Sequence, residues 1–157
     1  MAWSVLGDYL LTADATSTTY FQKIIPRNSD MILRAVRTYV IVFNNPTFTA
    51  LTMKLYSNNA GSPRALIATS TNSQAKASIT TLANAIKEIH FNFADIILKK
   101  DATYHLVLNA TGYTGTTSAH VAWKHSYPDP AYQTNVDMTF EGALVSPYDV
   151  LLIGSAL

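Results

Sequence analysis

Four histidines are the first residues whose chemistry needs an explanation. They are His90, His105, His120 and His125, and a zinc site would need three or four such ligands at tetrahedral positions. No two of them have the His-x-His or His-x-x-x-His spacing of paired metal ligands. His90 and His105 fall in neighbouring predicted strands, each opposite the apolar face, so we expect them to pair across the outer face of a sheet. We interpret the histidines as structural or surface residues and predict no metal.

The ten acidic residues are scattered along the chain and form no catalytic motif. Asp137 and Glu141 share a parity on one predicted strand, but a glycosidase needs two carboxyl groups at a defined short separation, which spacing alone does not establish. The chain has no cysteine and no Gly-x-Ser-x-Gly turn for a serine nucleophile. Residues 112–115 are not a phosphate loop, because no Lys-Ser or Lys-Thr follows them. We predict no catalytic residue and no cofactor, and therefore a protein that is not an enzyme.

Aromatic side chains are the stronger candidates for contact with a partner. Tyr113, Tyr127, Tyr132 and Tyr148 fall in predicted loops or strand ends, and Trp123 lies in a predicted strand. Aromatic rings anchor protein interfaces, and their faces can also stack on sugars. Three interpretations stay open at this point. Trp123 fills the core while the tyrosines cover the edge of the fold, or these residues form a protein interface, or they bind a glycan.

The elements that must position these side chains are short strands separated by turn residues. Residues 51–56 show the pattern, since Leu51, Met53 and Leu55 alternate with polar side chains. Residues 38–43 are β-branched and aromatic, although a helix also fits 31–37. The stretch 70–85 is ambiguous, with a strand at 78–81 or a helical turn at 82–85 as alternatives. The predicted strands are 9–12, 18–25, 31–43, 51–56, 66–69, 86–93, 103–109, 119–125, 135–140 and 150–153.

About eight to ten short strands, without strand–helix–strand alternation, predict an all-β fold. We expect an antiparallel β-sandwich of jelly-roll-like type. The 157 residues suit one domain, which we place at 1–157, with possible docking arms at 1–8 and 150–157.

The composition restricts the partners. Charged residues make up 13% of the chain, against about 25% in typical soluble proteins, and hydrophobic residues 48%. The net charge is +1 without any basic run, which argues against a nucleic-acid partner. No stretch predicts a membrane span, and the first residues do not resemble a signal peptide, so we expect synthesis in a cytoplasm. A weakly charged exterior is typical of a surface that neighbours cover.

A family likeness is carried by the run 51–70, LTMKLYSNNAGSPRALIATS, in which a turn with Gly61 and Pro63 separates two strands. Residues 88–93 and 98–108 continue it with an aromatic-bearing strand, a tight turn and a Tyr-bearing return strand. Over roughly 38–123 the chain resembles jelly-roll-type β-sandwich domains of phage virion proteins and bacterial surface proteins. The resemblance rests on turns and strands, so it implies a fold and transfers no catalytic residue.

These observations together favour a non-enzymatic structural component of a phage virion, either a capsid decoration protein or a tail-associated protein. Such a protein is made in the host cytoplasm, needs no signal peptide, and contacts other virion proteins. We expect a homo-oligomer, with a trimer as the first candidate. The alternative is a glycan-binding module that recognises a host receptor or a polysaccharide.

Overall fold

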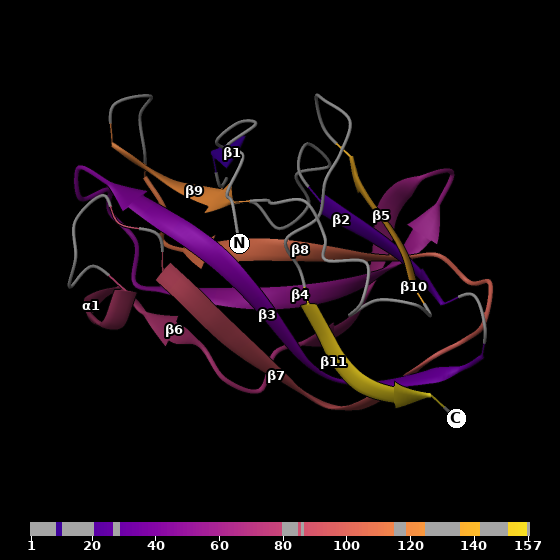
Figure 1. Ribbon diagram of the computed structural model, residues 1–157. Helices are drawn as coiled ribbons and strands as arrows, with labels where there is room; N and C mark the ends of the chain where they lie inside the picture. Colours follow the sequence, from indigo (N-terminus) through magenta and orange to yellow (C-terminus); the bar gives the residue numbers. More distant parts are fainter. Residues whose placement is uncertain are drawn as a thin grey trace.

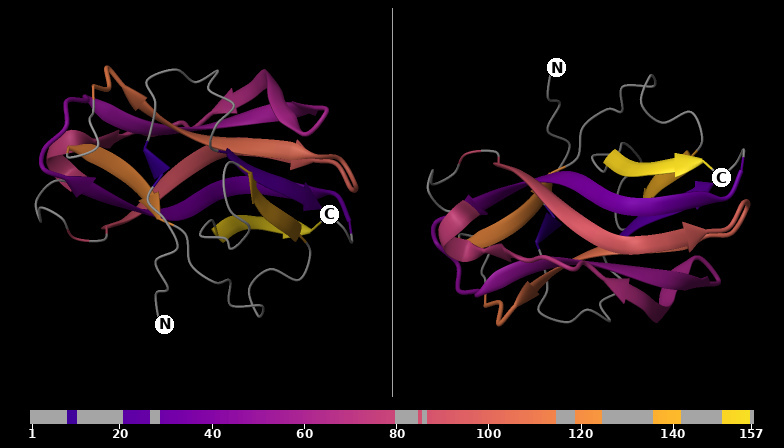
Figure 2. Two further views of the ribbon diagram at one scale, coloured as in Figure 1. Left: turned by 90° about the horizontal axis from the view of Figure 1, so that it is seen from above. Right: turned by 90° about the horizontal axis from the view of Figure 1, so that it is seen from below.

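The computed structural model describes residues 9–10, 21–26, 29–79, 85, 87–114, 119–124, 136–141 and 151–156. In these residues the chain forms two antiparallel sheets that pack face to face (Figure 1, Figure 2). The predicted all-β, antiparallel β-sandwich is confirmed. The elements are β1 (Tyr9–Leu10), β2 (Phe21–Pro26), β3 (Met31–Phe43), β4 (Ala50–Asn59), β5 (Ser62–Thr69), β6 (Gln74–Ala75), α1 (Lys76–Ile79), β7 (Lys87–Leu98), β8 (Tyr104–Thr111), β9 (His120–Lys124), β10 (Val136–Glu141) and β11 (Leu151–Ala156).

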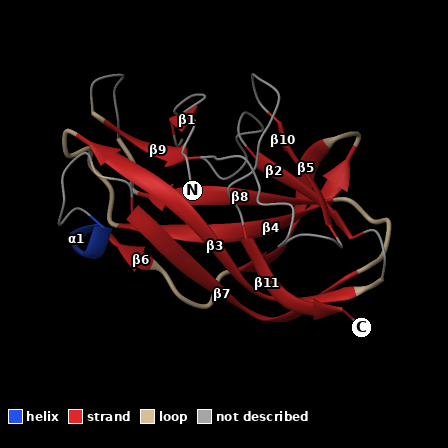
Figure 3. Cartoon of the chain, in the orientation of Figure 1, coloured by secondary structure: helices blue, strands red, loops and turns tan. Residues whose placement is uncertain are grey.

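The described residues form eleven strands, two of which, β1 and β6, have only two residues each. Strand β3 runs without interruption over Met31–Phe43, so the helix considered for 31–37 does not form. The strand considered for 78–81 is wrong, because residues 78 and 79 belong to the short helix α1 (Figure 3). Its Ile79 is buried in the core, so a helical turn there provides an apolar contact that the sequence pattern did not indicate. The helical turn considered for 82–85 falls mostly outside the described residues.

The first sheet, called the β3 sheet, is organised around its longest strand. Its order is β1-β9-β3-β11, and β7 also pairs with β3. Strand β7 follows Met31–Val40 along one edge of β3, whereas β11 and β9 pair with successive parts of the other edge. The C-terminal segment considered as a docking arm thus forms β11 within this sheet, while residues 1–8 lie outside the described residues.

The second sheet, called the β4 sheet, has the order β10-β2-β8-β4-β5, and β6 pairs with the start of β4. Strand β8 is internal, since it pairs with β2 on one side and with β4 on the other. Strand β5 ends this order, so among the described strands it pairs only with β4.

The core fills the space between the two sheets, because side chains of one parity on each strand point inward. On β4 the predicted alternation is confirmed, with Leu51, Met53 and Leu55 all fully buried. Burial of such side chains contributes roughly 1.5–3 kcal/mol each and is the main source of stability. The other large and fully buried apolar side chains are Trp123, Phe91, Ile24, Leu33, Leu98, Leu106 and Val36. In the described part of the chain, no helix has the length and apolar character to cross a membrane.

Candidate functional site

A polar network occupies the outer face of the β3 sheet, where β3 and β7 lie side by side. The pairing places Tyr39 opposite Glu88 and Arg37 opposite His90. These four side chains share one face because inward and outward positions alternate along each strand. Inward neighbours such as Ile89 are buried.

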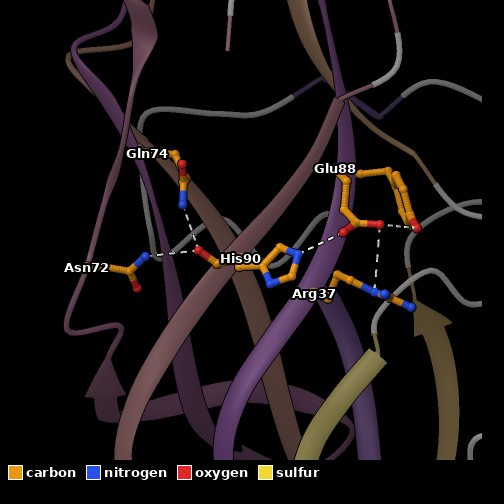
Figure 4. A network of polar contacts seen from close by, with 6 residues as sticks. Arg37, Asn72, Gln74, Glu88 and His90 are labelled. Atoms are coloured by element: carbon orange, nitrogen blue, oxygen red, sulfur yellow. Dashed lines mark hydrogen bonds and ion pairs between the residues drawn. The ribbon is translucent and has the colours of Figure 1, made fainter. Parts of the chain in front are cut away.

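Glu88 is the centre of this network (Figure 4). The Tyr39 hydroxyl donates to Glu88 Oε2 at 2.6 Å, and His90 Nε2 lies 2.8 Å from Glu88 Oε1. Arg37 Nε lies 3.8 Å from Glu88 Oε2 as an ion pair. Both carboxylate oxygens therefore have hydrogen-bond partners, and Arg37 adds a longer ion pair in which its Nε makes no hydrogen bond.

The electrostatics of the network favour recognition over proton transfer. The hydrogen bond from Tyr39 holds the pKa of Glu88 below its ordinary value, and the hydrogen bond with His90 acts in the same direction. A carboxylate that is held ionised by donors is a weak base, whereas a general base works best with a pKa near the operating pH. The arrangement suits a charge-balanced binding surface with donors and acceptors at fixed positions.

A second feature is an apolar patch on the edge strand β5. Leu66 is 52% exposed and Ile67 42% exposed, although both are large hydrophobic residues. Leu66 pairs with Tyr56 of β4 and Ala68 with Leu55, so the pairing shifts at this point and leaves Ile67 as an extra residue in β5. The shift is a β-bulge, in which two residues oppose one on the partner strand. Leu66 and Ile67 thus lie at the outer edge of the β4 sheet beside Tyr56.

The predicted contact residues separate into three groups. Trp123 is 1% exposed and belongs to the core, as the first of the three interpretations expects. Tyr113 is half-buried and packs against the core, and this burial raises the pKa of its hydroxyl. Tyr127, Tyr132 and Tyr148 lie outside the described residues. The structure therefore does not bring these five residues together as one described surface.

The histidines are also distributed differently from the expectation. His90 lies on the β3 sheet, whereas His105 lies on the β4 sheet, is fully buried, and has its Nε2 2.9 Å from Asn58 Oδ1. The predicted pairing of His90 with His105 is wrong, because β7 and β8 are neighbours in sequence but join different sheets. His120 packs against Phe43 with the ring centroids 4.8 Å apart, and His125 lies outside the described residues. No group of three metal-ligating side chains occurs among the residues that were described.

Sequence reasoning did not identify either of the two surface features. The network depends on the register between β3 and β7, which alternation alone does not give. The apolar patch could have been noticed in the sequence. A strand with one solvent-exposed face alternates apolar and polar residues, and the consecutive Leu66 and Ile67 break this alternation. In comparisons with known proteins, no family model matches the chain, and no curated protein matches it significantly.

Proposed function

We propose that the protein is a non-enzymatic structural component of a phage virion, a capsid-decoration or tail-associated protein that works through protein–protein contacts. In this role its sandwich is of the jelly-roll type, it is made in the host cytoplasm, and it resides in the virion beside other virion proteins. The observation that carries the proposal is the exposure of Leu66 and Ile67 on edge strand β5.

Leaving this apolar patch in water costs free energy. Covering apolar surface yields roughly 25 cal/mol per Å², so two adjacent exposed hydrophobic side chains favour a contact. Exposed apolar residues that stand alone are ordinary, but here two adjacent ones lie next to Tyr56 at a sheet edge. The low share of charged residues, 13%, adds to this, because few charges oppose close approach of another subunit.

The first experiment measures the oligomeric state by size-exclusion chromatography with light scattering at micromolar concentration. We expect a homo-oligomer, a trimer being the favoured state, and a shift toward monomer in the double variant Leu66→Ser, Ile67→Ser. Ile97→Ser is the matched control, since Ile97 is 51% exposed on β7 of the other sheet. A wild-type chain that stays monomeric would count heavily against the proposal.

The virion role itself is tested by the genes that flank this one. Capsid, portal or tail genes beside it support the proposal, whereas a polysaccharide-utilisation cluster contradicts it. A direct test is mass spectrometry of purified phage particles from the source, in which the protein is expected at a high and stoichiometric copy number.

Glycan binding is a second candidate, and the network around Glu88 favours it. Sugars are bound by planar polar groups held at fixed positions beside an aromatic ring, and Arg37, Glu88 and Tyr39 provide such a set. A glycan array probed with the wild-type chain tests this candidate. Binding that is lost in Arg37→Ala and kept in Arg34→Ala, which changes an exposed arginine outside the network, supports it, and a flat array removes it.

A further inference from the structure

The edge of β7 that faces away from β3 is covered by a segment that does not pair with it as a strand. Among the described strands, β7 pairs only with β3. Residues 70–73, which we call the strap, run along its other edge, and the side chains of Asn72 and of Gln74, the first residue of β6, are directed at β7 (Figure 4). The strap follows β5 in the chain and leads into β6 and α1.

The Asn72 side chain takes the place of a neighbouring peptide group. Its Nδ2 donates to the carbonyl of His90 at 3.0 Å, and its Oδ1 accepts from the amide of Asn92 at 2.6 Å. In a pair of parallel strands, one residue makes the same two bonds. Its N–H donates to the carbonyl of the residue before the one it faces, and its carbonyl accepts from the N–H of the residue after. The Asn72 amide therefore stands opposite Phe91 as a single residue of an added strand would.

Two further hydrogen bonds reach carbonyl groups on the same edge of β7. The backbone N–H of Thr71 donates to the carbonyl of Asn92 at 2.8 Å. Gln74 Nε2 donates to the carbonyl of His90 at 2.7 Å, so that oxygen accepts two bonds. The carbonyl of His90 and the N–H and carbonyl of Asn92 are thus occupied, mainly by side chains.

The start of the strap is fixed to the opposite sheet. The N–H of Ser70 donates to the carbonyl of Met53 in β4 at 2.8 Å, and the N–H of Met53 donates to Ser70 Oγ at 3.1 Å. The same hydroxyl donates to the carbonyl of Asn72 at 2.7 Å. The chain is bonded to β4 again directly after the strap, where Gln74 of β6 pairs with Leu51, so the position of the strap does not depend on β7 alone.

The remainder of this edge is interrupted by a bulge. Leu33 pairs with Ile96 and Ala35 with Asn92, so β7 has extra residues at this point. One of them, Asp95, has a φ of 41° and an ion pair with Arg34 at 3.3 Å. Bulges and charges are the features by which proteins keep sheet edges from pairing with other chains.

We propose that the strap is an edge guard, which keeps β7 from adding a strand of a second copy of this chain. An unguarded edge of this length would offer a row of free N–H and carbonyl groups, and such edges recruit other strands. The guard acts whether or not the protein assembles through the β5 patch, so it does not rest on the proposed function.

The test compares two substitutions at one position. Asn72→Ala removes both side-chain bonds to β7, whereas Asn72→Asp loses only the bond to the His90 carbonyl, keeps the acceptor for the Asn92 N–H and adds a charge that itself deters pairing. Hydrogen exchange at the Asn92 amide is expected to be about tenfold faster in Asn72→Ala, as for the loss of one ordinary hydrogen bond. In Asn72→Asp this exchange is expected to stay close to wild type.

Sedimentation velocity over a range of concentrations gives the decisive readout. Asn72→Ala is expected to form larger species than wild type, while Asn72→Asp keeps the wild-type profile. Faster exchange with an unchanged sedimentation profile, or unchanged exchange, overturns the proposal. Should Asn72→Ala fail to fold, Asn72→Ser decides the question, since its short hydroxyl cannot bridge the His90 carbonyl and the Asn92 N–H, and it must still increase self-association. A monomeric wild-type chain would contradict the β5 contact without affecting this test.

Discussion

The indole of Trp123 donates to the hydroxyl of Thr38 at 2.7 Å inside the core. Trp123 comes from β9 and Thr38 from β3, and both side chains are almost wholly removed from water. A buried indole N–H needs a partner, because an unsatisfied polar group in the interior costs free energy. This bond therefore links the central strand of the β3 sheet to the largest side chain of the core.

The first prediction concerns that bond. Thr38→Val keeps the shape of the side chain but leaves the Trp123 N–H without this acceptor, so we expect a loss of about 1–3 kcal/mol in the free energy of unfolding. Urea denaturation followed by tryptophan fluorescence measures it. Thr38→Ser is the control, because it keeps the hydroxyl and loses one methyl group, at about 0.8 kcal/mol. Equal stability of Thr38→Val and wild type would contradict the prediction.

The strands could be predicted from the sequence because alternation is a local signal, and 51–56 and 88–93 show it clearly. The sheet to which each strand belongs could not. Strands β7 and β8 follow one another with a short turn, which suggests one hairpin, yet the turn passes from one sheet to the other. That single topological fact separates His90 from His105 and made their predicted pairing wrong.

The candidate surfaces were harder to predict from the sequence than the fold. Polar contacts between distant residues could not be predicted even in the core, where Thr38 and Trp123 are 85 residues apart in sequence. The same holds for Tyr39 and Glu88, which meet only because of the register between β3 and β7. Strand β5 was expected to begin at residue 66, but it begins at Ser62, since Pro63 is compatible with the end of an edge strand.

The second prediction concerns the turn between β4 and β5. Asn59 pairs with Ser62, and the two residues between them have positive φ angles, 50° for Ala60 and 88° for Gly61. Two-residue turns of this kind prefer Asn-Gly, because asparagine tolerates the left-handed region better than alanine. Ala60→Asn is therefore expected to stabilise the protein by about 0.5–1 kcal/mol, seen as a higher Tm in differential scanning fluorimetry.

The matched substitution in this turn is Gly61→Ala. A Cβ at Gly61 would meet no atom within 4 Å, so any loss of stability must come from the backbone conformation. We expect a decrease of about 1 kcal/mol, opposite in sign to the effect at Ala60. If the two substitutions changed the Tm in the same direction, the explanation by φ angles would be wrong.

The third prediction concerns the bulge in β7. Asp95 has a φ of 41°, a region that β-branched residues adopt only with strain. Asp95→Val is expected to destabilise the protein by about 1–2 kcal/mol. Asp95→Gly relieves the strain and loses only an exposed ion pair with Arg34, so its stability should stay close to wild type. Chemical denaturation of both variants checks this, and a loss in Asp95→Gly as large as in Asp95→Val would refute it.

The fourth prediction concerns the pH dependence that Asp30 contributes. Its carboxylate accepts from Lys99 Nζ at 2.8 Å and from the backbone N–H of Lys100 at 2.7 Å, which ties the start of β3 to the turn after β7. The hydrogen bond from Lys99 holds the pKa of Asp30 below its ordinary value, with the Lys100 N–H acting in the same direction. A group whose pKa is lower in the folded state stabilises above its unfolded pKa, and this contribution is lost as the pH falls through the folded pKa.

Asp30→Asn should therefore be less stable than wild type at neutral pH, and the difference should shrink as the pH falls below about 4, where aspartate takes up its proton in the unfolded chain. Lys99→Met is the control, since it removes the ammonium group but leaves the bond from the Lys100 N–H, and it should show a smaller effect over the same pH range. Thermal unfolding of the three proteins between acidic and neutral pH measures both differences. A difference between Asp30→Asn and wild type that stays constant down to acidic pH would mean that the carboxylate charge does not stabilise this turn.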